Sequence, residues 1–181
     1  MEKSINKNIN LALRYLLAIS VATLCAVALP QIFHAFGVFA GMGGKFGQMF
    51  LPMYLPVLIL AIKTNAIVGV IAGVSSPIVS YAISGMPTAS MLPLIIIELI
   101  CFGFFAGLLS KTKINVFSKL LIIQVVSRVL RIAATLILSC FISDITITAT
   151  AALSGIILAI PGYILQLLVV PYFVNTKHFD I

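Results

Sequence analysis

The chain has 181 residues, of which 62% are hydrophobic and 8% charged, and its formal net charge is +7. A soluble domain carries about 25% charged and about 45–50% apolar residues. The composition therefore excludes a soluble globular protein and predicts a single integral membrane domain over residues 1–181.

Apolar segments long enough to cross a bilayer recur along the whole chain. A helix needs about 20 apolar residues to cross the hydrocarbon core. By that measure we predict an all-α membrane protein whose six transmembrane helices cover residues 10–32, 48–63, 65–84, 89–110, 117–142 and 148–174.

The first span follows a basic segment and contains Ala26-Val27-Ala28, a combination that also occurs in cleavable signal peptides. The apolar run continues to Phe33, so we expect a membrane-spanning helix. Ala18, Ala22 and Ala26 follow one another at four-residue intervals and form a smooth face that allows close approach of another helix.

A glycine-rich segment from His34 to Gln48 separates the first two spans and is expected on the outer side. Gly44-Lys45 resembles part of a phosphate-binding loop, but Phe39 and Phe46 stand where that motif needs glycine and Ser or Thr. A nucleotide site is thereby excluded. The segment is either a flexible lid over a cavity or a plain connector.

Prolines and glycines predict local features of the later spans. Pro52 and Pro56 predict an irregular or kinked outer half of the short second span, Pro77 predicts a bend in the third, and Pro161-Gly162 a bend in the sixth. Two pairs of glycines four residues apart predict close helix packing within the chain: Gly69 with Gly73, and Gly103 with Gly107.

Basic residues gather on one side of the predicted topology. That side holds Lys3, Lys7, Arg14, Lys63, Lys111, Lys113, Lys119 and Lys177, and the other side holds Lys45. Eight against one indicates that the first side, with both termini, is cytoplasmic. The net charge is thus explained without a nucleic-acid partner.

One carboxylate, Glu98, lies inside the apolar stretch PLIIIELICF. Counted from a helix start near Thr88, it lies about 15 Å deep. Arg131, in the antiparallel fifth span, lies about 18–20 Å from an outer end near Asp144, a residue expected in an outer loop, and Arg128 lies one turn deeper. We therefore expect Glu98 and Arg131 to meet.

The two arginines belong to a polar stripe on the fifth span. Its members are Gln124, Arg128, Arg131, Thr135 and Ser139, which stay within an arc of roughly 100°. A charge facing lipid would cost about 2.5–3.5 kcal/mol, so the stripe is expected to face the bundle interior or a watery cavity. Two arginines against one glutamate leave surplus positive charge, which favours a ligand site; a structural ion pair or a lipid-headgroup contact is the alternative.

Enzymatic chemistry finds little support in the sequence. His34 and His178 lack the H-E-x-x-H pattern of membrane metalloproteases, and a single buried carboxylate does not make a hydrolase pair. The three cysteines lie in apolar runs with no spacing typical of disulfides or zinc. We predict no catalytic residue, no metal site and no cofactor.

Four segments, in this order, resemble the substrate-binding (S) components of energy-coupling factor (ECF) transporters. They are FLPMYLPVLIL, VGVIAGVSSPIVSYAISGMP, MLPLIIIELICFGFFAGLL and PGYILQLLVVP. Together they extend over nearly the whole chain. Tyr54 departs from the pattern, because relatives more often have histidine there.

The resemblance implies an ABC-type importer subunit in a bacterial cell membrane that captures a vitamin or related micronutrient. Its partners would be a transmembrane coupling subunit, which docks on Ala18, Ala22 and Ala26, and two cytoplasmic ATPases. The substrate site would include Glu98, Arg128, Arg131, Tyr54 and Thr135. The gating loops would include His34, Lys45, Gln48 and Met86. Riboflavin, cobalamin, pantothenate, folate-like and queuine-like molecules all remain open as substrates, and a membrane scaffold or a standalone channel or enzyme is the alternative.

Overall fold

The computed structural model describes residues 2–42, 45–89, 91–141 and 157–176, and these ranges are helical with short connections. The helices are α1 (Glu2–Phe39), α2 (Lys45–Phe50), α3 (Tyr54–Lys63), α4 (Ala66–Ser84), α5 (Leu92–Leu109), α6 (Val116–Phe141) and α8 (Ile160–Asn175). Four of them are long and apolar enough to cross a membrane, over residues 9–39, 66–84, 92–109 and 116–137. The predicted helical membrane protein is confirmed at this level.

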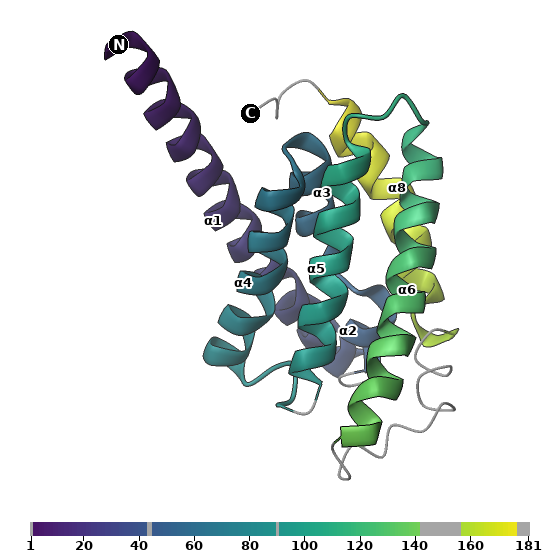
Figure 1. Cartoon of the computed structure of the whole chain (residues 1–181). Helices are drawn as coiled ribbons and strands as arrows, with labels where there is room; N and C mark the ends of the chain where they lie inside the picture. The colour runs from purple at the N-terminus through teal and green to yellow at the C-terminus, as the bar shows by residue number, and fades with distance from the viewer. Residues whose placement is uncertain (1, 43–44, 90, 142–156, 177–181) are drawn as a thin grey trace.

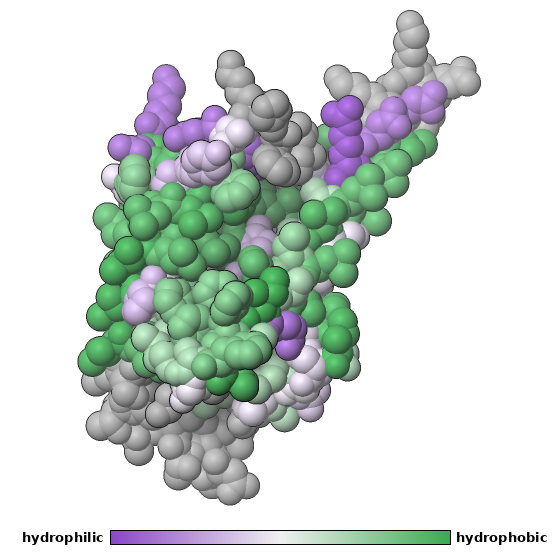
Figure 2. Space-filling view, turned by 180° about the vertical axis from the view of Figure 1, so that it is seen from behind, coloured by the Kyte–Doolittle hydropathy of each residue, from purple (hydrophilic) through white to green (hydrophobic). Residues whose placement is uncertain are grey.

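The helices form one bundle in which α5 is central (Figure 1). It packs against α4 on one side and α6 on the other, α3 lies behind it, and α8 runs beside α6. The start of α1 and the end of α8 lie at the same end of the bundle, which we call the upper end. Figure 2 shows hydrophilic residues gathered at that end above a broad hydrophobic band.

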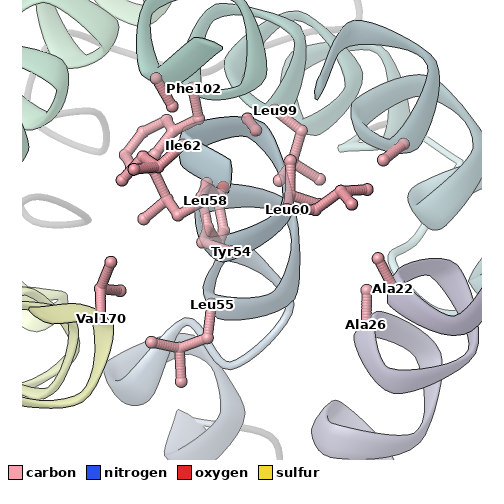
Figure 3. Packing of buried hydrophobic residues seen from close by; sticks show 14 of the residues in the cluster. Ala22, Ala26, Tyr54, Leu55, Leu58, Leu60, Ile62, Leu99, Phe102 and Val170 are labelled. Carbon is pink, nitrogen blue, oxygen red and sulfur yellow. The ribbon is translucent and has the colours of Figure 1, made fainter. Parts of the chain in front are cut away.

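The short helix α3 contributes the most deeply buried apolar residues beside α5. Val57, Leu58 and Ala61 are fully buried, and Tyr54, at the start of α3, packs its ring edge-on against Phe102 of α5 with the ring centres 5.0 Å apart (Figure 3). An apolar helix of ten residues gains stability mainly from such burial, because an isolated helix of this length is marginal in water.

Glycines bring α4 and α5 into backbone contact. A Cβ atom placed on Gly69 or on Gly103 would overlap the backbone carbonyl of the other residue, and one on Gly73 would lie 2.6 Å from the carbonyl oxygen of Leu99. Gly107 likewise meets the backbone of Ala66. The prediction that these glycine pairs serve packing within the chain is confirmed.

The alanine stripe of α1 requires a correction. Ala26 is fully buried, Ala22 is 7% exposed, and Ala18 packs at the edge of the same core (Figure 3). A docking face must be open to its partner, and Ala22 and Ala26 are covered by the chain itself. The small residues that were expected to receive a coupling subunit instead let α1 approach the bundle closely.

The predicted second span is a broken helix. The segment between α2 and α3 contains Pro52, and Leu51 has a φ of +47°, a left-handed conformation that ends α2 and redirects the chain into α3. Pro56 follows in the first turn of α3, where a missing N–H leaves no hydrogen bond unmade. The predicted irregularity is confirmed.

The predicted loop from His34 to Gln48 is wrong at both ends, because α1 continues to Phe39 and α2 begins at Lys45. Tertiary contacts order this segment: the rings of Phe33, Phe46 and Phe50 cluster with centres 4.8–5.9 Å apart. His34 lies so close to Gly47 that a Cβ there would be 2.8 Å from its ring.

Candidate ligand-binding site

Glu98 lies on α5 at the point where α3 and α6 also meet. It lies about 9 Å from the start of α5 and about 16 Å from its end, at 1.5 Å per residue. Its side chain is fully buried. The break before α3 directs Tyr54 toward it, and α6, antiparallel to α5, supplies Arg128 and Arg131.

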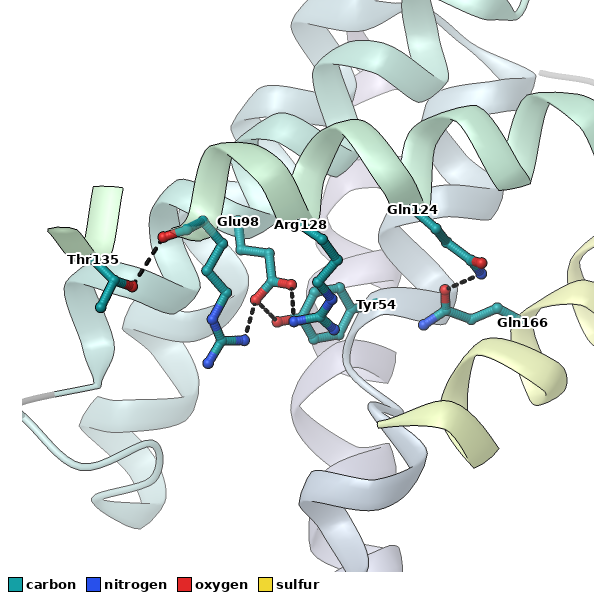
Figure 4. A network of polar contacts seen from close by, with 7 residues as sticks. Tyr54, Glu98, Gln124, Arg128, Thr135 and Gln166 are labelled. Carbon is teal, nitrogen blue, oxygen red and sulfur yellow. Dashed lines mark hydrogen bonds and ion pairs between the residues drawn. The ribbon is translucent and has the colours of Figure 1, made fainter. Parts of the chain in front are cut away.

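Three side chains contact the Glu98 carboxylate (Figure 4). The Tyr54 hydroxyl donates to Oε2 at 2.7 Å, and Nη1 of Arg131 donates to the same oxygen at 2.6 Å. Nη1 of Arg128 lies 2.6 Å from Oε1 as an ion pair, although Oε1 has no hydrogen bond of good geometry among the described residues. The predicted meeting of Glu98 with Arg131 is confirmed.

Two guanidinium groups share this one carboxylate, so the cluster carries a formal charge of +1. The Arg128 side chain is only 9% exposed, whereas that of Arg131 is 26% exposed. Coulomb interactions are strong in such an environment, and an uncompensated charge there is costly. The arrangement favours the approach of a negative group.

Arg128 is only partly satisfied by the protein. Its guanidinium carbon lies 4.9 Å from the centre of the Tyr163 ring, a cation–π distance. Its Nε and Nη2 atoms are buried and have no hydrogen-bond partner among the described residues. The guanidinium thus lies against the Tyr163 ring, while its Nε and Nη2 edge has donors without an acceptor.

A second polar pair links α6 to α8. Nε2 of Gln124 donates to Oε1 of Gln166 at 3.1 Å, and Gln166 is fully buried (Figure 4). Nε2 of Gln166, like the hydroxyl of Tyr163, is buried without a hydrogen-bond partner in the part of the chain that the structure describes. Two side-chain pairs therefore link α6 to α8, Arg128 with Tyr163 and Gln124 with Gln166, and each pair includes a donor without a partner.

Sequence reasoning missed Tyr163 and Gln166 as members of the site. They stand three residues apart in the apolar stretch PGYILQLLVVP and therefore share one face of α8. The same helical spacing identified the stripe on α6. Applied to α8, it would have found both residues.

Each buried donor left without an acceptor costs about 1–3 kcal/mol, and more when it is charged. Three such nitrogen atoms, Nε and Nη2 of Arg128 and Nε2 of Gln166, occur between α6 and α8. A ligand that offered acceptor oxygens or nitrogens would recover part of this cost. The arrangement is therefore suited to bind a polar molecule with several acceptors.

The remaining stripe residues face inward as predicted, as far as the structure describes them. Gln124 is 7% and Thr135 3% exposed. The Thr135 hydroxyl donates to the carbonyl of Arg131 at 2.9 Å, so it is engaged with its own helix. The side chain of Ser139 lies outside the described residues, as does Asp144.

The expected gating residues are dispersed. His34 lies on α1 against α2, and Met86 lies, 42% exposed, in the α4–α5 connection, which is at the lower end of the bundle in Figure 1. The side chains of Lys45 and Gln48 are outside the described residues. A lid role for any of these residues stays a prediction.

Comparisons with family models, with characterised proteins and with solved structures found no match for this chain. Among the described residues, no three His, Cys, Asp or Glu side chains form a group that could hold a metal ion.

Proposed function

We propose that the chain is the substrate-binding subunit of an ECF-type ABC importer, which captures a vitamin or related micronutrient outside a bacterial cell. The observation that carries the proposal is Arg128: a buried guanidinium in a membrane-type bundle, with surplus positive charge around it and free donors on one edge. Intramembrane ionisable groups of this kind mark substrate pathways.

The proposed topology has six membrane passages with both termini in the cytoplasm. The second passage combines α2 and α3, and the sixth is α8, whose 16 residues extend about 24 Å. The start of α1 and the end of α8 share the upper end of the bundle. Lys63 is the last residue of α3, and Lys111 and Lys113 follow α5; both helices end at the upper end, which supports its cytoplasmic location.

The proposed partners are a transmembrane coupling subunit and two cytoplasmic ATPases, which would supply ATP hydrolysis. The subunit itself would bind its substrate without transforming it. With Ala22 and Ala26 buried, we assign no docking face for the coupling subunit.

A membrane scaffold is the second candidate function, and Glu98 favours it. Its carboxylate is fully buried and surrounded by three side chains of the same protein, as expected of an ion pair that only fixes helix packing. In a scaffold, however, the free edge of Arg128 would have no purpose.

The test is native mass spectrometry of mildly solubilised protein, combined with uptake in cells with and without the ATPases. We expect a bound small molecule in the wild type and ATPase-dependent uptake of it. In Arg131→Ala, whose side chain is the more exposed of the pair, affinity should fall about 10- to 100-fold, since a hydrogen bond to a charged group contributes about 1.5–3 kcal/mol.

Arg14→Ala is the matched control, because Arg14 is exposed near the upper end of α1. It should keep wild-type affinity. A wild-type protein that binds no small molecule, in cells whose ATPases change no uptake, would favour the scaffold.

A further inference from the structure

We propose that the Nε–Nη2 edge of Arg128 binds a carboxylate of the solute, and that Nε2 of Gln166 donates to a second acceptor on the same molecule. This inference rests on the proposed function and names the chemical class of its substrate: a monocarboxylate with a further acceptor about one helical turn away.

The free edge of Arg128 has the right shape for a carboxylate. Nη1 of Arg128 is paired with Glu98, and the guanidinium carbon lies 4.9 Å from the centre of the Tyr163 ring. The Nε and Nη2 groups left over point their N–H bonds in parallel, as a fork that matches the two oxygens of a carboxylate.

The charge of the cluster selects a single negative charge. Arg128, Arg131 and Glu98 sum to +1, so one carboxylate makes the occupied site neutral. A neutral ligand would leave the surplus charge buried, which is unfavourable. A phosphate monoester, with a charge of about −1.5 to −2, would reverse the sign.

Gln166 extends the site along α8. Gln124 donates to Oε1 of Gln166 and so fixes its amide with the nitrogen turned away from Gln124, on the side where Arg128 lies in Figure 4. Gln124 and Arg128 are four residues apart on α6, and Tyr163 and Gln166 are three apart on α8. The Gln124–Gln166 pair and the Arg128–Tyr163 pair are thus about 5–6 Å apart, which is one helical turn.

The experiment measures binding to the purified full-length protein in detergent, read from ligand-induced thermal stabilisation. The probes are benzoate, benzamide and 3-acetylbenzoate, whose ketone lies about one helical turn from its carboxylate. We expect benzoate to bind at least about 10-fold more tightly than benzamide, since they differ in charge and not in shape. 3-Acetylbenzoate should bind more tightly than benzoate.

Two variants locate the site. Arg128→Lys keeps the charge but loses the fork, and should weaken benzoate binding at least about 10-fold, whereas the exposed Arg14→Lys should not. Gln166→Leu should remove only the advantage of 3-acetylbenzoate over benzoate. If Arg128→Lys does not fold, two measurements still test the proposal: the comparison of benzoate with benzamide in the wild type, and the loss of the 3-acetylbenzoate advantage in Gln166→Leu.

Equal binding of benzoate and benzamide, no binding of either, or a neutral co-purified solute would overturn the carboxylate assignment, even if ATPase-dependent uptake is found. Acid-selective binding that needs Arg128, without such uptake, keeps the assignment and refutes the importer. Competition of phosphatidylglycerol with benzoate in the wild type but not in Arg128→Lys would identify a lipid phosphate as the occupant and would also overturn it.

Discussion

Replacement of Glu98 by glutamine tests whether charge, rather than shape, stabilises the centre of the bundle. Glu98 is fully buried, with Tyr54 at 2.7 Å and Arg128 and Arg131 at 2.6 Å each. Glutamine has nearly the same size and keeps one carbonyl acceptor, but it raises the charge of the cluster from +1 to +2. Removal of one partner from a buried ion pair costs about 3–5 kcal/mol.

We therefore expect Glu98→Gln to lower the free energy of unfolding by about 3–5 kcal/mol, which for a chain of this length lowers the Tm by at least about 6 °C. In the double variant with Arg131→Gln the cluster returns to +1. The double variant should then be more stable than the sum of the two single losses by about 0.5–3 kcal/mol.

Far-UV circular dichroism during heating in detergent is a suitable assay, since the chain has no tryptophan for intrinsic fluorescence. Lys111→Gln, which removes an exposed charge, is the control and should stay within about 0.5 kcal/mol of the wild type. A Glu98→Gln protein as stable as this control, or strictly additive losses in the double variant, would refute the electrostatic reasoning.

Two further predictions concern packing and topology. Gly103→Ala should destabilise the protein by about 1–3 kcal/mol in the same assay, because the new Cβ would overlap the backbone of Gly69. The control is Leu108→Ala, because Leu108 is 55% exposed on the same helix and its replacement should have little effect. Equal effects of the two substitutions would contradict backbone contact between α4 and α5. With the native cysteines replaced, Met42→Cys should react with a membrane-impermeant maleimide on intact cells and Thr112→Cys only after permeabilisation, and the reverse pattern would contradict the proposed orientation.

The sequence by itself determined the helical class and the interior face of α6. It also located four long spans, and most of the predicted span ends lie within a few residues of the observed ones. It also predicted that Glu98 and Arg131 lie at one level. These features follow from the fixed rise and period of a helix and from the cost of exposing charge to lipid. The rise and period of a helix and the cost of exposing charge to lipid do not depend on which helices are neighbours.

Only the tertiary structure decided which residues of different helices are in contact. Tyr54 and Glu98 are 44 residues apart, and Gln124 and Gln166 are 42 apart, so neither pair follows from local spacing. The same limit explains the alanine stripe: small residues four apart predict a close helix contact, but whether the partner is α3, α4 or another protein depends on packing. The environment of Arg128 likewise depends on three helices, because its Nη1 is paired with Glu98 of α5 and its guanidinium lies against Tyr163 of α8.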